Sequence, residues 1–325
     1  MPTFLSVQSL SKQIGQQRAL QSVSFELQQF QKLAIAGETG SGKSTLLKMM
    51  GGLVQPDAGA VYYEGKRVPG PNEQLIPGHP QIGYLSQHFE LRNHYRVHEL
   101  MEMANLLTDE QAQEIYEVCQ VDHLLKRWTH ELSGGEKQRI SLAKLLVTNP
   151  GLILLDEPFS NLDLPHKNTM RQVLAAMSNQ LHTTCILVSH DAQDVLSWAD
   201  SILMLQGGQL VQQGAAAEVY RKPANSYCAS LLGSVQLLSP PVAAAMSGVS
   251  VADIHAAVFV RPEWIELSDN KGIPGVVTQV LFCGNFYLLH VTCAGEEVQV
   301  QVQKNPPSPG ETLWLTADAA DFWYW

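Results

Sequence analysis

The sequence is poor in the features that mark membrane-spanning, secreted and nucleic-acid-binding proteins. Its 325 residues contain no run of ~20 uninterrupted apolar residues, so no segment is expected to span a membrane. The opening MPTFLSVQSLSKQ lacks the basic start and apolar block of a signal peptide. Five cysteines are scattered without a CxxC pair, which favours a reducing cytoplasm over a disulfide framework. The formal net charge of -10 argues against a general affinity for nucleic acid or for anionic lipid.

What the sequence does contain is an alternation of short apolar runs and longer helical stretches. Three apolar runs that end in polar residues predict buried parallel strands at 32–36, 152–155 and 185–188. This pattern predicts an α/β sheet that binds ligands at the carboxyl ends of its strands. Other patterns predict antiparallel strands in residues 1–30 and 57–68, a helical insert at 97–127, and a hairpin at 201–214 that turns at Gly207-Gly208.

The composition changes near residue 235, and a second, smaller domain is expected beyond that point. The stretch SPPVAAAMSGVS at 239–250 is typical of a linker. Strand-like segments follow, among them the alternating EVQVQVQ at 297–303, which predicts half-buried strands in a small β-barrel or sandwich. Residues 236–325 carry three basic and nine acidic side chains, a net charge of -6, which disfavours a nucleic-acid-binding barrel.

The stretch GETGSGKS at 37–44 is a glycine-rich bend between an apolar strand and a helix. It satisfies the pattern G-x-x-x-x-G-K-[ST], in which backbone amides at a helix start hold phosphate and glycines allow its close approach. Lys43 is expected to contact the β- and γ-phosphates, and the Ser44 hydroxyl to ligate Mg²⁺. The alternative, a glycine-rich turn without a ligand, is disfavoured by the strand-loop-helix context. The candidate nucleotide-binding residues here are Gly37, Glu38, Thr39, Gly40, Ser41, Gly42, Lys43, Ser44 and Thr45.

Two acidic residues follow the apolar strand at 152–155. They place two carboxylates at the carboxyl edge of the sheet, beside the phosphate-binding loop. Asp156 is expected to hold Mg²⁺, directly or through water, and Glu157 to polarise the attacking water as a general base. For an isolated Asp-Glu pair the alternative is a solvated strand end, which the neighbouring phosphate-binding loop disfavours.

A second candidate anion site lies in LSGGEKQR at 132–139. Ser133, Gly134 and Gly135 precede a helix that is expected to run from Glu136 to about Val147. The loop at 37–44 already serves the nucleotide of its own chain. A second phosphate contact therefore makes sense if it serves a nucleotide that another copy holds.

These three segments together resemble those of the ATP-binding subunit of ABC transporters. GETGSGKS resembles the Walker A motif of that family, LILLDE its Walker B motif and LSGGE its signature motif. The resemblance implies a P-loop NTPase cassette at 1–235 with a RecA-like α/β core, an antiparallel β-subdomain and a helical subdomain at about 88–131. It also implies that two cassettes pack head to tail, with ATP between the Walker A motif of one and the signature of the other.

The resemblance also implies roles for residues outside these three segments. Gln87 in YLSQHF matches the Q-loop glutamine, which contacts Mg²⁺ and senses the membrane subunit. Asp163 in SNLD resembles the D-loop residue that communicates across the dimer, and His190 in LVSHD matches the switch histidine, which contacts the γ-phosphate and orients Glu157. Ile14 stands where the family usually places an aromatic residue that stacks on adenine, so discrimination of ATP from GTP is expected to be weak.

The C-terminal stretch VFVRPEWIEL at 258–267 resembles the TOBE domain, an OB-like β domain of many importer ATPases. This resemblance implies a linker at 236–255 and an all-β domain at 256–325. The terminal FWYW is expected to cap the barrel, and an interface anchor is the alternative.

As a whole, the resemblance implies an ATPase that uses ATP and Mg²⁺, pairs as a homodimer and drives substrate import through a membrane permease. A substrate-binding protein and a location on the cytoplasmic face of the inner membrane are implied as well. The stretch at 93–107 is expected to dock a permease helix, and its apolar residues lie either on that surface or in the core of the insert: Met101, Met103, Leu106 and Leu107. The alternatives are an exporter ATPase, or a soluble ABC protein of DNA repair or translation, which would have fused cassettes or a coiled-coil insert. No residue selects the transported substrate.

Overall fold

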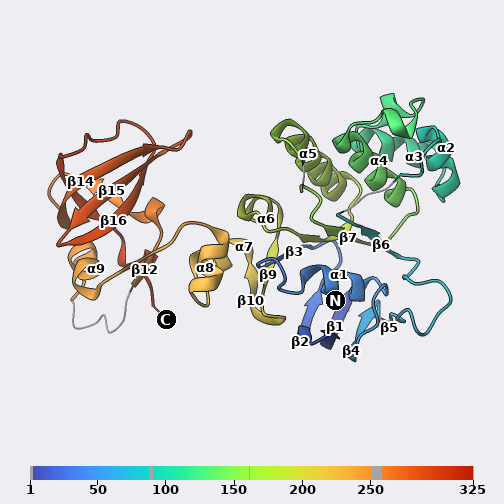
Figure 1. Cartoon of the computed structure of the whole chain (residues 1–325), viewed down its shortest axis with the longest axis horizontal. Coiled ribbons are helices and arrows are strands. Elements are labelled where there is room, and N and C mark those ends of the chain that lie inside the picture. Colours follow the sequence, from blue (N-terminus) through green and yellow to red (C-terminus); the bar gives the residue numbers. More distant parts are fainter. Residues whose placement is uncertain (1–2, 88–90, 161, 251–257, 325) are drawn as a thin grey trace. The chain divides into compact units, whose positions relative to one another are not determined.

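The computed structural model describes residues 3–87, 91–160, 162–250 and 258–324, and the chain divides into two compact units, Met1–Ala217 and Glu218–Trp325 (Figure 1). This division lies before residue 235, where we expected the domain boundary. Among the described residues, no helix combines the length and the apolar character that crossing a bilayer requires.

A six-stranded sheet forms the centre of the first unit, with the strand order β10-β9-β3-β8-β7-β6. All neighbours are parallel except β10, which pairs antiparallel with β9 through the turn at Gly207 and Gly208, where both residues have positive φ. The three predicted parallel strands and the predicted hairpin are therefore confirmed. The strands are β3 (Lys32–Ala36), β6 (Ile82–Leu85), β7 (Leu152–Asp156), β8 (Thr184–Val188), β9 (Ser201–Gln206) and β10 (Gln209–Ala215).

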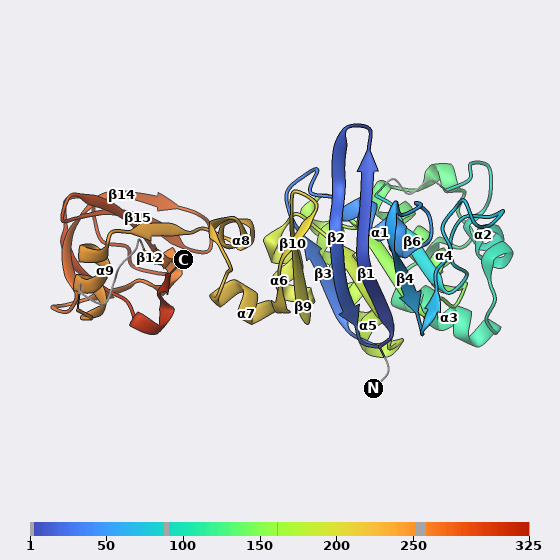
Figure 2. The same cartoon turned by 90° about the horizontal axis from the view of Figure 1, so that it is seen from below.

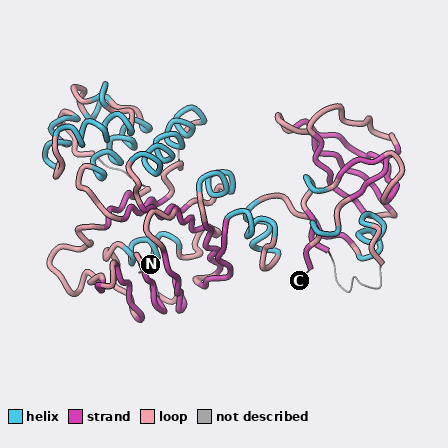
Figure 3. The backbone as a smooth tube through the Cα atoms, turned by 180° about the vertical axis from the view of Figure 1, so that it is seen from behind, coloured by secondary structure: helices cyan, strands magenta, loops and turns pink. Residues whose placement is uncertain are grey.

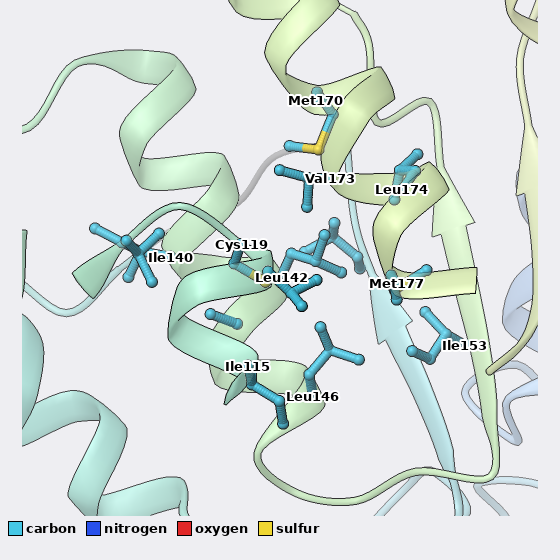
Figure 4. Packing of buried hydrophobic residues seen from close by; sticks show 14 of the residues in the cluster. Ile115, Cys119, Ile140, Leu142, Leu146, Ile153, Met170, Val173, Leu174 and Met177 are labelled. Atoms are coloured by element: carbon cyan, nitrogen blue, oxygen red, sulfur yellow. The ribbon is translucent and has the colours of Figure 1, made fainter. Parts of the chain in front are cut away.

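Both faces of this sheet are buried, as expected of parallel strands. Alternate residues of β7 point to opposite sides: Ile153 and Leu155 join one apolar core, and Leu152 and Leu154 join another. The first core lies between the sheet and helices on one face, and Figure 4 shows part of it. Those helices are α2 (Val97–Ala104), α3 (Asp109–Val118), α4 (Gly134–Leu146) and α5 (Leu164–Gln180), and α6 (Ala192–Trp198) follows β8.

The opposite face of the sheet carries helix α1 (Lys43–Met50) and a four-stranded antiparallel sheet of order β2-β1-β4-β5 (Figures 1 and 2). The expected antiparallel strands near the N-terminus are thus confirmed. The long hairpin of β1 and β2 ends beside the loop at 37–44, so its tip belongs to the same region as the predicted site. These strands are β1 (Leu5–Ile14), β2 (Gln17–Leu27), β4 (Ala58–Tyr63) and β5 (Lys66–Arg67).

The helical insert separates its apolar residues between core and surface. Met101 is fully buried in the core between the helices and the central sheet, whereas Met103 is 63% exposed and Leu106 is 76% exposed. Leu107 is partly buried against the same core. Met101 and Leu107 therefore pack in or against a core, Met103 and Leu106 lie at the surface, and docking of a permease helix to this stretch stays a prediction.

The second unit is built from antiparallel strands around a core of its own (Figure 3). Its strands form a three-stranded sheet, β11-β12-β18, and a five-stranded sheet, β13-β17-β14-β15-β16, consistent with the OB-like fold. The strands are β11 (Gln236–Leu238), β12 (Val258–Val260), β13 (Glu266–Ser268), β14 (Ile273–Phe282), β15 (Tyr287–Cys293), β16 (Glu296–Val302), β17 (Thr312–Thr316) and β18 (Trp323–Tyr324). The helices are α7 (Ala216–Arg221), which crosses the division between the units, α8 (Ser226–Leu232) and α9 (Pro240–Ser247).

Two C-terminal segments can be compared with their expectations. Residues 236–255 differ from the expected linker: β11 and α9 occupy much of the segment, and Val242 and Met246 lie in the core. The rest of it, 251–257, lies outside the described residues. At the C-terminus, Phe322 is buried in the same core and β18 pairs with β12, which supports a cap over an interface anchor.

Candidate active site

The candidate residues gather at the carboxyl edge of the central sheet. The loop at 37–44 follows β3, Gln87 follows β6, Asp156 ends β7 with Glu157 directly after it, and His190 follows β8. Since β3, β8, β7 and β6 are consecutive parallel neighbours, their carboxyl ends meet along one edge. A pocket of about 420 Å³ lies there, lined by Ile14, Gln17, Ala19, Thr39, Gly40, Gly42, Lys43, Ser44, Thr45, Gln87, Glu157 and His190.

The backbone of the loop at 37–44 requires glycine at two of its positions. Gly42, the N-cap of α1, has φ 102°, and a Cβ atom there would lie 2.3 Å from the carbonyl oxygen of Ala19. A Cβ atom on Gly37 would lie 2.4 Å from the carbonyl oxygen of Leu205. The loop is therefore packed closely against two neighbouring segments, which fixes its path at the helix start.

The Lys43 side chain is buried against the first residues of this loop. Its Nζ donates to the carbonyl oxygens of Gly37 (2.7 Å) and Glu38 (2.8 Å). Burial lowers the pKa of Lys43, and the carboxylates of Glu157, Asp156 and Glu38 oppose that shift. Gly37, Glu38 and Ser41 are not among the residues that line the pocket.

The buried carboxylate of Asp156 accepts hydrogen bonds from two partly buried hydroxyl groups. Its Oδ1 accepts a hydrogen bond from Ser44 Oγ (2.8 Å), and its Oδ2 accepts one from Tyr84 Oη (2.8 Å). Burial and the hydrogen bond to Asp156 raise the pKa of Tyr84 well above its usual range, so this residue acts as a donor. Ser44 and Gln87 line the pocket and Asp156 does not, although its carboxylate contacts Ser44. The hydroxyl, the carboxylate and the Gln87 amide supply oxygen ligands of the kind that suits Mg²⁺. Sequence reasoning missed Tyr84.

Glu157 and His190 contact each other where β7 and β8 end. Glu157 Oε2 lies 3.2 Å from His190 Nδ1, and the Glu157 amide donates to the carbonyl of Val188 (3.0 Å). Glu157 has φ 48°, a left-handed conformation that is unfavourable for a residue with a side chain and that tends to occur at functional sites. The carboxylate remains partly exposed, 19%, so it reaches both the imidazole and the pocket.

The segment LSGGE has a well-formed helix start but does not line the pocket of its own chain. Ser133 is the N-cap of α4: its Oγ accepts from Glu136 N (3.3 Å), and Glu136 Oε2 accepts from Ser133 N (2.7 Å). Ser133 and Gly134 are exposed, and Gly135 packs against the His166 ring. Helix α4 begins two residues earlier than the sequence predicted.

Asp163 is likewise a helix cap outside the pocket. It is the N-cap of α5, and its Oδ1 accepts a hydrogen bond from His166 N (3.1 Å). Hydrogen bonds from His166 lower the pKa of Asp163. Asn161, in the same SNLD segment, lies outside the described residues.

Comparisons with known proteins agree with this geometry. A family profile described as ABC transporter matches residues 20–160, and one described as TOBE domain matches residues 258–325. The sulfate/thiosulfate import ATP-binding protein CysA of Synechococcus elongatus is 31% identical over 86% of this chain and 83% of its own length. The Fe(3+) ions import ATP-binding protein FbpC of Pseudomonas fluorescens is 34% identical over 90% and 88%. The solved structure of cbiO1 from Clostridium perfringens, part of the ABC transporter complex cbiONQ, is similar with a TM-score of 0.61 and 26% identity, over 68% of this chain and 91% of that one.

Proposed function

Because this chain belongs to the ABC transporter family, we propose that it couples ATP hydrolysis at the site around Glu157 to substrate uptake through a membrane permease. The chain is an importer-type ATP-binding subunit, since relatives that it matches over most of their length are import ATP-binding proteins. It hydrolyses ATP during transport, as ATPases of this family do. The exporter alternative is not favoured.

The loop at 37–44 and the residues around it bind the nucleotide in this proposal. Backbone amides at the start of α1 hold the phosphates, and Lys43 contacts the β- and γ-phosphates. Ser44, Gln87 and Asp156 hold Mg²⁺, a role supported by the contact of Ser44 Oγ with Asp156 Oδ1. When bound, this ion offsets the charge that develops on the phosphate oxygens.

The contact of Glu157 with His190 is the single observation that carries the proposal. Glu157 accepts a proton from the attacking water, and His190 holds the carboxylate in place and contacts the γ-phosphate. Both side chains line the pocket that the phosphate-binding loop also lines, so a γ-phosphate bound by the loop faces them. Nucleophile activation and phosphate binding are thereby brought together at one edge of the sheet.

A second copy of the chain completes each site in this proposal. Ser133, Gly134 and Gly135 are exposed or lie at an exposed helix start, and the pocket of the same chain does not include them. In a head-to-tail homodimer they bind the phosphates held by the partner, and Asp163 communicates between the two sites. ATP then stabilises the pair because it contacts both copies.

The remaining partners of the proposed importer are a permease and a substrate-binding protein, with this chain on the cytoplasmic face of the inner membrane. The two relatives are named for different cargoes, sulfate or thiosulfate and Fe(3+), although each is about one third identical to this chain. This supports a division of labour in which the permease and the binding protein select the substrate and this chain supplies the energy.

Replacement of Glu157 by glutamine tests the proposal. Glu157→Gln keeps the shape of the side chain but removes the base, so ATP turnover should fall at least about 100-fold while ATP binding persists. The ATP-bound pair should then accumulate, which size-exclusion chromatography with Mg-ATP detects. Glu114→Gln, an exposed site on α3, is the matched control. Turnover at the normal rate in Glu157→Gln would exclude this residue as the base.

A further inference from the structure

A group of opposite charges joins helix α5 to the loop that carries His190. Lys167 Nζ, on α5, lies 2.5 Å from Asp191 Oδ2 and 2.9 Å from Asp194 Oδ2. Arg171, one turn further along α5, donates to Asp194 Oδ1 from Nη2 (2.6 Å) and from Nε (2.9 Å). Asp191 directly follows His190, so α5 is attached next to the histidine.

The burial of this group makes its geometry demanding. Only 1% of the Asp194 side chain is exposed, and 18% of the Lys167 side chain. A buried carboxylate is tolerated when it is paired and hydrogen-bonded, and Asp194 has two cations as partners. Loss of Lys167 leaves Asp194 with Arg171 but leaves the carboxylate of Asp191 without a cation.

Asp191 holds the segment around His190 through hydrogen bonds to α6, to α5 and to Ser189. Its Oδ1 accepts a hydrogen bond from Gln193 N (2.9 Å) and caps α6, while its Oδ2 accepts from Lys167. Its own amide donates to Ser189 Oγ (3.1 Å). His190 lies between these two anchored residues, so a displacement of Asp191 moves the imidazole.

The same turn of α5 begins at Asp163. Lys167 N donates to the carbonyl oxygen of Asp163 (2.9 Å), so Lys167 lies one helical turn after the cap. A pocket of about 310 Å³ adjoins this turn, and Lys167 lines it together with Glu157, Ser160 and His190. The helix that Asp163 caps therefore contacts the loop of His190 beside the general base.

We propose that Lys167 is a positioning residue that holds His190 against Glu157 and links this contact to Asp163 through the first turn of α5. The proposal rests on the proposed function, since it concerns the geometry of that catalytic site. A movement of Asp163 would be transmitted by Lys167 to the loop of His190 over one helical turn. His190 would then contact Glu157 only when the first turn of α5 lies against the loop of His190.

The test replaces Lys167 by methionine, which keeps the length of the side chain and removes its charge. In the full-length chain with Mg-ATP, Lys167→Met should lower kcat at least about tenfold, because His190 is no longer held, and should leave the Kd for ATP within about twofold. Lys167→Arg should restore most of kcat, since it retains a cation at this position. Lys66→Met, on the exposed strand β5, is the matched control.

A second variant separates positioning from folding. Asp191→Asn retains an oxygen that can cap α6 but loses its charge toward Lys167, and its effect on kcat should not add to that of Lys167→Met. An unchanged kcat in Lys167→Met would overturn the proposal. Additive effects on kcat in the double variant Lys167→Met/Asp191→Asn would overturn it as well. So would equal losses of kcat and of ATP affinity in Lys167→Met that Lys167→Arg does not restore. Glu157→Gln, measured in parallel, distinguishes the two proposals. If it abolishes turnover while Lys167→Met is normal, only the role of Lys167 fails.

Discussion

At the scale of single residues, Ile14 is the residue that we propose contacts the base of the nucleotide. It is the last residue of β1, it is 56% exposed, and it lines the pocket beside Gln17, its partner across the hairpin. An isoleucine covers a purine by apolar contact but offers no ring to stack on it. Every purine nucleotide presents a similar apolar face, so we expect this residue to contribute little discrimination between ATP and GTP.

Ile14→Tyr should therefore tighten ATP binding. A stacked aromatic pair contributes about 0.5–1.5 kcal/mol beyond its buried area, which corresponds to a Kd about two- to tenfold lower. Calorimetric titration of ATP and GTP into both proteins measures this effect. Ile76→Tyr is the control, because Ile76 is 82% exposed and does not line the pocket. Unchanged affinity in Ile14→Tyr would show that the base does not contact this position.

The sequence predicts the residues of the motifs better than it predicts the residues that contact and position them. Ser44 and Asp156 belong to patterns with a chemical reason, and the structure brings them within 2.8 Å. Tyr84 contacts the same carboxylate but belongs to no such pattern. Its role depends on the pairing of β6 with β7, which places residue 84 beside residue 154 in the register. Strand pairing is a tertiary property, so the local sequence gave no sign of it.

At the scale of elements, α9 shows how composition misleads. The stretch at 239–250 contains two prolines and several small residues, which favours a linker. The same residues suit a helix: Pro240 and Pro241 stand in its first turn, where proline is tolerated, and Gly248 ends it with φ 73°. Four of its residues are buried, among them Val242 and Met246. Burial against the β domain decides the outcome, and composition alone does not reveal that partner. Strands β3, β7 and β8 of the central sheet were predictable because nearly all of their residues are apolar.

The carboxylate of Glu73 holds the loop after β5, and its lowered pKa makes the stability of the folded protein depend on pH. Glu73 accepts hydrogen bonds from Arg67, Gln55 and Gly70, and these, chiefly the bond from Arg67, lower its pKa from 4.5 to about 2. A pKa that is lower in the folded state stabilises the fold above the unfolded value of 4.5, and this stabilisation is lost as the pH falls towards 2.

Glu73→Gln should therefore lower stability at pH 7 more than at low pH. Since the Glu73–Arg67 pair is at the surface, solvent screening keeps the difference small. Urea unfolding midpoints of both proteins, compared between pH 7 and pH 3, measure it. Glu64→Gln serves as a control, because it replaces a nearby carboxylate by an amide. A difference between Glu73→Gln and wild type that stays constant over this range would mean that Glu73 is not held by Arg67 in solution.

At the scale of the whole molecule, the arrangement of the motifs supports the proposal that one chain is half of a catalytic unit. Lys43, Glu157 and His190 surround one pocket, whereas the start of α4 is exposed elsewhere on the same cassette. In the proposed pair, each site combines Lys43 of one copy with Ser133 of the other. Two inactive chains that are damaged in different motifs should then complement each other.

Lys43→Ala removes the phosphate contact, and Ser133→Arg places a bulky cation at the start of α4 while nucleotide binding to the loop at 37–44 stays intact. Each homodimer has two damaged sites and should be inactive. A mixed dimer has one site with both defects and one with neither. With random pairing of equal amounts, half of the dimers are mixed, so ATP turnover should return to about a quarter of the wild-type rate if the two sites act independently.

Mixing Ser133→Arg with the doubly altered chain is the control and should restore nothing. If mixed dimers were detected but the mixture stayed inactive, the head-to-tail pair would be wrong. Each chain would then have to bind both faces of its own nucleotide.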